Sequence, residues 1–161
     1  MSQPIATAAS APRAPWWVTT FNPITKRLLS AGVPLGFNGL VTIRGRKTGL
    51  QRTTPIAIIE YQGRRWVWAP WGGAQWVQNL RAAGVATIKT RRRTLDVRAT
   101  ELDRQQRLVF FRDVLGPVAR EIPFGVRFIR TVDGVDLTDP EEAADGRPVF
   151  ELLPLGTGPS A

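Results

Sequence analysis

The chain has 161 residues, which fits one domain able to bury a substantial core, and its 43% hydrophobic content with six tryptophans argues against disorder. It contains no cysteine and no histidine, which excludes disulfides, thiolate nucleophiles, Ser-His-Asp triads and metal sites built on Cys or His. The net charge of +9 is concentrated in residues 1–100, which carry 15 basic and 2 acidic residues, and such a field attracts polyanionic small molecules, nucleic acid or an anionic membrane surface.

The N-terminal part predicts a tail followed by a helix. Residues 1–15 are small, polar and proline-punctuated, lack the apolar core of a signal peptide, and are expected to be disordered. No uncharged apolar run approaches the roughly 18 residues that span a bilayer, so we expect a cytoplasmic protein. Residues 16–35 carry apolar side chains at helical spacing, among them Trp17 and Phe21. This segment is either a helix packed over the domain or an interfacial anchor at the inner face of the cell membrane.

The rest of the chain predicts a small barrel. Strand patterns cover residues 37–44, 51–61, 65–69, 85–90, 94–101 and 148–153. Helical patterns cover residues 74–83, 103–115 and part of 116–130, and the acidic residues 133–147 are rich in turns. Five or six short strands, mostly antiparallel, with helices at both ends indicate an α+β fold. We expect a single domain over residues 16–153 and a second disordered tail over 154–161.

A cationic turn is the most informative local feature. Four basic side chains and no acidic one lie within nine residues, namely Arg44, Arg46, Lys47 and Arg52. Gly45 and Gly49 allow a tight turn and a close approach of the backbone to a ligand, and Lys, Arg and the Thr48 hydroxyl suit a phosphate-bearing ligand. A P-loop is excluded because Arg46 replaces the glycine that precedes the lysine. The alternative is a solvated basic hairpin without a ligand.

Two ordered motifs carry a family resemblance. The first is G-R-K-T-G-x-x-R-x-x-P over residues 45–55, and the second is G-G-x-x-W-x-x-N-L-R over residues 72–81. Together they resemble the deazaflavin-dependent nitroreductase family of the FMN-binding split-barrel superfamily, and the likeness covers roughly residues 37–102. The resemblance implies a split β-barrel that binds coenzyme F420, with FMN as the weaker candidate.

The same resemblance implies the cofactor-binding residues. They are Arg46, Lys47, Thr48, Arg52, Pro55, Pro70, Trp71, Gly72, Gly73, Trp76, Asn79 and Leu80. The cationic turn would meet the phosphate and acidic tail of F420, and residues 70–73 would border the deazaflavin ring. Trp76 and Leu80 stand at i and i+4 of a helix, so they are either core anchors or pocket walls. Asn79 is interpreted as a hydrogen-bond strut or internal cap.

The chain also departs from the family pattern. Only two residues separate Gly73 from Trp76, whereas many family members have a longer loop there. Tyr61 is the only tyrosine, whereas family members that reduce nitroimidazoles use tyrosines near the substrate. The C-terminal part offers Phe124 and Phe128 instead. The candidate substrate pocket consists of Trp17, Phe21, Phe124 and Phe128.

The predicted function is that of an F420H2-dependent oxidoreductase that transfers hydride to a quinone, an enone or a nitroaromatic compound. With no histidine, the proton comes either from solvent or from Tyr61. The expected partners are a small lipophilic acceptor such as a quinone and a peripheral membrane contact, with no specific nucleic acid and no metal. Two alternatives stay open: a non-catalytic split-barrel binder of F420, flavin or fatty acid, and a basic nucleic-acid or membrane-surface module.

Overall fold

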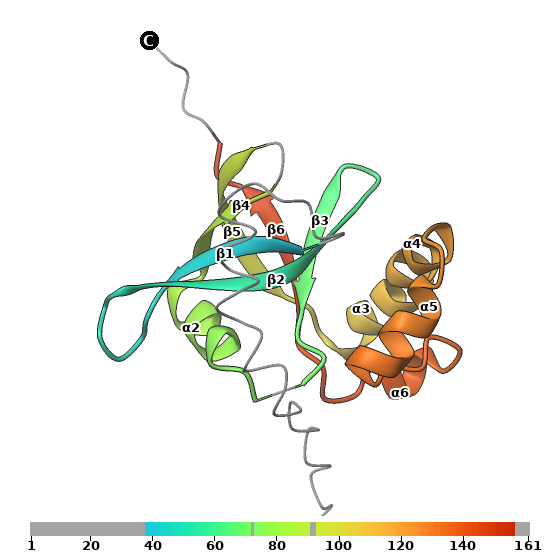
Figure 1. Cartoon of the computed structure of the whole chain (residues 1–161). Helices are drawn as coiled ribbons and strands as arrows, with labels where there is room; N and C mark the ends of the chain where they lie inside the picture. Colours follow the sequence, from blue (N-terminus) through green and yellow to red (C-terminus); the bar gives the residue numbers. More distant parts are fainter. Residues whose placement is uncertain (1–37, 72, 91–92, 157–161) are drawn as a thin grey trace, which may run out of the picture.

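The computed structural model describes residues 38–71, 73–90 and 93–156 (Figure 1). Within these residues, six strands follow in chain order: β1 (Asn38–Arg44), β2 (Gln51–Tyr61), β3 (Arg64–Trp68), β4 (Val85–Lys89), β5 (Thr94–Glu101) and β6 (Val149–Pro154). All neighbouring strands pair antiparallel, in a closed barrel of order β1-β2-β3-β6-β5-β4. The predicted α+β split barrel is therefore confirmed. The helix expected over residues 16–35, with Trp17 and Phe21, lies outside the described residues.

The β1–β2 hairpin carries the cationic turn. Arg44 pairs with Gln51 at its end, and the ladder runs from there to Asn38 and Ala57. The turn is closed by two backbone hydrogen bonds of 2.8 Å, from Gly45 N–H to the Leu50 carbonyl and from Gly49 N–H to the Gly45 carbonyl. Gly49 has a φ of 71°, which a side chain would disfavour, so glycine is required here.

Helix α2 (Gln75–Ala83) packs against one end of the barrel. Its apolar residues Val77 and Leu80 are buried in the same core cluster as the inward-facing residues of the strands. The helix ends at Gly84, where φ is 68° and the backbone N–H donates to the Leu80 carbonyl at 2.8 Å. This αL ending agrees with the helical pattern predicted to end at residue 83.

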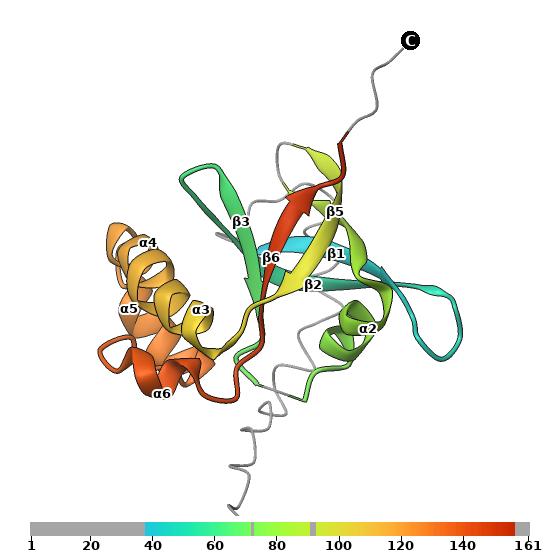
Figure 2. The same ribbon diagram turned by 180° about the vertical axis from the view of Figure 1, so that it is seen from behind.

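A helical insert separates β5 from β6. It consists of α3 (Arg104–Val109), η1 (Phe110–Leu115), α4 (Gly116–Glu121), α5 (Gly125–Phe128), η2 (Ile129–Asp133) and α6 (Pro140–Ala144). The first three run on without a break, so the helix predicted to end at residue 115 continues to Glu121. The π-helical stretch η1 lies just before Pro117, which has no N–H to donate to the preceding turn. Figures 1 and 2 show the insert and α2 on different sides of the barrel.

Strand β3 separates two apolar cores. Val67 points into the barrel, whereas Trp66 and Trp68 point outward to the insert. The ring of Trp68 meets that of Phe111 edge-on, with 5.5 Å between centroids, and Trp66 lies 5.9 Å from Phe110. Aromatic pairs of this kind contribute about 0.5–1.5 kcal/mol each beyond burial of their area. The outward tryptophans therefore fix the insert against the barrel.

Candidate functional site

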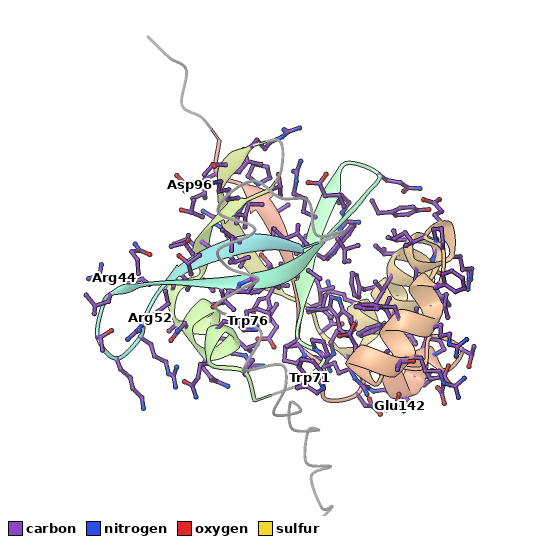
Figure 3. All side chains as sticks on the ribbon, viewed as in Figure 1. Arg44, Arg52, Trp71, Trp76, Asp96 and Glu142 are labelled. Atoms are coloured by element: carbon purple, nitrogen blue, oxygen red, sulfur yellow. The ribbon has the colours of Figure 1, made fainter. Side chains whose placement is uncertain are left out.

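A groove of about 520 Å³ lies between the β1–β2 hairpin and α2. Figure 3 shows Arg52 on the hairpin and Trp76 on α2 at its two sides. Its walls come from both elements and are formed by Ile43, Gly45, Arg46, Lys47, Thr48, Gln51, Arg52, Thr53, Thr54, Gln75, Trp76 and Asn79. Three of these residues are cationic and none is acidic, so the groove favours an anionic ligand.

Arg46 is held in place by two side chains of α2. Its backbone N–H donates to Asn79 Oδ1 at 3.2 Å, and its guanidinium Nη1 donates to the same oxygen at 3.0 Å and to Gln75 Oε1 at 3.1 Å. Asn79 is only 9% exposed. Because both acceptors are neutral amides, they orient Arg46 without cancelling its charge.

The remaining polar residues of the turn divide into two groups. Lys47 and Arg52 are exposed and line the groove. Thr48 also lines it, and its Oγ1 accepts the Leu50 N–H at 3.3 Å, which stabilises the turn. Arg44 does not line the groove, because its guanidinium lies over Gly49, within 3.4 Å of the position a Cβ would take there.

The two apolar residues of the second motif have different positions. Trp76 is half-buried, lines the groove, and packs against Phe150 of the barrel core with 6.2 Å between ring centroids. Leu80 is 1% exposed and belongs to that core. The sequence allowed both residues to be either core anchors or pocket walls. In the structure Trp76 lies in the groove wall, and Leu80 is a core residue.

The loop between β3 and α2 contributes accessible backbone. Pro70 and Trp71 are half-buried, Gly73 is exposed, and Gly72 lies outside the described residues. A Cβ added at Gly73 would meet no atom of the described residues within 4 Å, its chain neighbours aside, so this part of the fold leaves space next to Gly73. Figure 3 shows Trp71 between α2 and the insert.

Eight of the predicted site residues that the structure describes do not line the groove: the core residue Leu80, the loop residues Pro70, Trp71 and Gly73, and four others. Pro55 is half-buried opposite Leu40, one residue beyond the last β2 residue of the wall. Tyr61 is half-buried at the far end of β2, roughly 23 Å from Thr54 along the strand at 3.3 Å per residue. Phe124 and Phe128 are exposed on the insert, so the described chain does not bring them to the groove.

Sequence reasoning missed several residues of the wall, and Gln75 is the most important of them. Gln75 and Asn79 are four residues apart on α2, so both side chains fall on one helix face. That spacing could have identified Gln75 once Asn79 was chosen. Thr53 and Thr54 carried no such signal, because their place in the wall depends on the helix that packs beside β2.

Residues 38–71, 73–90 and 93–156 offer neither a metal site nor a membrane-spanning helix. No group of three or more acidic side chains there is placed to hold a metal ion. No helix in that part of the chain is both long enough and apolar enough to cross a membrane.

Solved structures of other proteins share this architecture. HutZ, the heme storage protein of Vibrio cholerae, is 16% identical with a TM-score of 0.51, over 83% of this chain and 89% of HutZ. A putative 5-nitroimidazole antibiotic resistance protein of Bacteroides thetaiotaomicron is 10% identical with a TM-score of 0.51, over 81% and 80%. The F420-H2 dependent reductase FDR-A is 21% identical with a TM-score of 0.48, over 72% and 93%. At these identities the first two show the fold alone.

Sequence comparison gives a more specific result. No curated protein sequence matches the chain significantly. The family model of the F420H(2)-dependent quinone reductases matches residues 17–120, which is more than half of the chain and includes both motifs. The resemblance to deazaflavin-dependent reductases is thereby confirmed, and the chain belongs to the F420H(2)-dependent quinone reductase family.

Proposed function

We propose that this protein is a reductase that holds reduced coenzyme F420 in the groove beside α2 and delivers hydride to a quinone. The observation that carries the proposal is a groove with three cations and no acid, in which Arg46 is oriented in advance by Asn79 and Gln75. The family to which the chain belongs supports the choice of cofactor and of acceptor class.

The groove residues fit the anionic part of F420. A guanidinium has five N–H donors, and the contacts of Arg46 with α2 use only Nη1. Its Nε–H and Nη2–H groups therefore remain for phosphate or carboxylate oxygens. Lys47 and Arg52 add two further charges, and each charge-assisted hydrogen bond is worth about 1.5–3 kcal/mol.

The loop before α2 suits the flat end of the cofactor. When bound, F420H2 supplies a hydride from its deazaflavin ring, as the family's chemistry implies. In our proposal the ring is bordered by Pro70, Trp71 and Gly73. It also packs against the indole ring of Trp76. Among the described residues, nothing but its chain neighbours comes within 4 Å of the place where a Gly73 side chain would stand, which permits close approach of a ring to the backbone.

We further propose that solvent protonates the reduced acceptor. The chain has no histidine and no cysteine, and Tyr61 stands at the far end of β2 from the groove. The contribution of the protein is then orientation and electrostatics, since no side chain of the groove wall is an ordinary general acid near neutral pH. Enones and nitroaromatic compounds are further candidate acceptors for the same hydride.

A binding titration followed by a turnover assay tests this function. F420, FMN, FAD and NADPH are titrated side by side, and we expect F420 to bind most tightly because it combines a ring with a long anionic tail. Reduced F420 is then mixed with menadione, and its oxidation is followed by absorbance. Tight binding without oxidation of F420H2 would instead identify a non-catalytic binder, and preference for FMN would reject the cofactor assignment.

A further inference from the structure

The turn between α4 and α5 exposes two aromatic side chains. Phe124 is 81% exposed and Phe128 is 60% exposed, and both are phenylalanines, which have no polar group to offer water. The Phe128 N–H donates to the Phe124 carbonyl at 2.8 Å, so the two residues lie one helical turn apart on the same side. Adjacent exposed aromatics on one face indicate a contact surface.

The backbone holds Phe124 in this outward position. Its φ of 62° is left-handed, which is rare for a bulky residue and costs free energy. The next residue, Gly125, is buried, and a Cβ there would collide with the Ala119 carbonyl of α4. Because α5 starts directly against α4, the turn projects Phe124 away from the insert. Figures 1 and 2 show this turn on the outer side of the insert, away from α2.

Three arginines line a hollow together with Phe124. This shallow hollow of about 690 Å³ has an apolar floor and a basic rim, and its residues include Ile122, Val126, Arg120, Arg127, Arg130 and Thr131. Arg130 lies 3.6 Å from Asp136, whereas Arg120 and Arg127 form no ion pair within the part of the chain that the structure describes. Two unneutralised guanidinium groups thus flank the aromatic face.

We propose that this α4–α5 face, formed by Phe124, Phe128, Arg120 and Arg127, docks on the surface of an anionic phospholipid membrane. The phenylalanines would enter the boundary between headgroups and acyl chains, and the arginines would bind lipid phosphates. The inference goes beyond the proposed reductase activity. It does not depend on the cofactor groove, which lies on a different side of the barrel.

Charge favours an anionic membrane over two other candidate occupants of this face, namely a second copy of the chain and the N-terminal segment of the same chain. A second copy of the chain, with net charge +9, would place the same arginines against each other. The N-terminal segment, residues 1–37, contains three basic residues and no acidic one, so it does not complement a basic rim either. An anionic bilayer supplies both the negative charge and the apolar layer that the face requires.

Vesicle sedimentation of the full chain tests the proposal. We expect binding to vesicles of phosphatidylglycerol and phosphatidylcholine, and far weaker binding to phosphatidylcholine alone. Phe124→Gly should lower the partition coefficient by about fivefold while raising the melting temperature, because glycine relieves the left-handed strain. Arg127→Gln should lower the partition coefficient by about fivefold as well. A basic side chain near an anionic membrane surface strengthens binding by roughly that factor.

The matched control removes one charge and one exposed apolar side chain from the barrel. Arg98 and Leu153 are register partners on β5 and β6, and both are exposed, so Arg98→Gln combined with Leu153→Ser should leave vesicle binding unchanged. The proposal is overturned if Phe124→Gly and Arg127→Gln bind vesicles like the parent. It is also overturned if these variants lose affinity only for a single-stranded oligonucleotide, or if they only convert a parent dimer to a monomer in light scattering.

Discussion

Asn79 Oδ1 accepts two hydrogen bonds from Arg46, one from the backbone N–H at 3.2 Å and one from the guanidinium at 3.0 Å. The two residues are 33 positions apart in the chain, so this contact joins the cationic turn to α2. One buried amide therefore fixes both the backbone and the charge of a groove arginine.

Replacing Asn79 should weaken cofactor binding without abolishing the fold. Asn79→Ala removes both bonds, and we expect F420 affinity to fall about tenfold, which corresponds to roughly 1.4 kcal/mol. Titration of F420 by fluorescence measures this change. Gln78→Ala is the control, because Gln78 is on the same helix but does not line the groove. Equal losses of F420 affinity in the two variants would show a general effect on α2. They would contradict a specific role for the hydrogen bonds between Asn79 and Arg46.

The cations of the turn should contribute unequally. Lys47→Ala and Arg52→Ala should each weaken F420 binding by on the order of 1.5–3 kcal/mol, with the affinity of the parent falling as salt is added. Arg44→Ala removes the same charge from the same hairpin, yet Arg44 does not line the groove. We expect Arg44→Ala to retain most of the affinity. Isothermal titration at two salt concentrations checks the ranking. Identical losses of affinity in all three variants would show that F420 responds to the overall positive charge of the hairpin and not to specific contacts in the groove.

Gly73→Val should separate ligand binding from folding. No atom of the described residues, chain neighbours aside, lies within 4 Å of a Cβ placed at Gly73, and its φ is not left-handed, so a valine there should not change the melting temperature. The side chain should instead occupy the position proposed for the ring and lower F420 affinity by at least about tenfold. Gly73→Ala serves as the graded control. A folded Gly73→Val protein with parental affinity would show that the glycine forms only a turn.

Tyr61→Phe should leave turnover intact. Tyr61 is remote from the groove along β2 and packs against the core of the insert. If solvent supplies the proton, kcat for menadione and its pH profile should match those of the parent within about twofold. Steady-state kinetics with F420H2 between pH 6 and 9 provides the measurement. A loss of about 100-fold in kcat at unchanged stability would establish Tyr61 as the proton donor.

Stability should respond to pH through Asp133. Burial raises the pKa of Asp133 from 3.8 to about 6, so the folded state binds the proton more tightly than the unfolded state. The stability of the parent should therefore fall as pH rises from about 4 to about 6. Asp133→Asn should stabilise the protein at pH 7.5 by on the order of 1–3 kcal/mol and should have no such effect below pH 4.

Urea denaturation at both pH values measures the effect of Asp133→Asn. Asp113→Asn is the opposite control, because a hydrogen bond from Arg112 lowers the pKa of Asp113. That variant should bring no gain at pH 7.5. A parental pH profile in Asp133→Asn would contradict the assignment to Asp133.

The local part of this structure could be read from the sequence, because its signals act within a few residues. Period-two alternation over residues 94–101, the glycine turn at Gly45 and Gly49, and the stop at Gly84 all depend on backbone sterics and nearby hydrogen bonds. The split-barrel architecture followed from the family resemblance carried by two motifs, whereas the order of strands came from the structure. The strand bounds of β2 and β5 agree with those predicted.

The tertiary structure alone decided which of these residues meet. Arg46 reaches Asn79 and Gln75 only because α2 packs beside the hairpin, whereas Arg44, at the end of β1 in the same hairpin, lies over Gly49 instead. The insert holds Phe124 and Phe128 far from the groove because Trp66 and Trp68 fix it to the outer face of β3, a contact between segments about 40 residues apart. Sequence periodicity defines which face of an element is apolar, but the partner of that face is selected by packing across the whole fold, and that choice has no local signal.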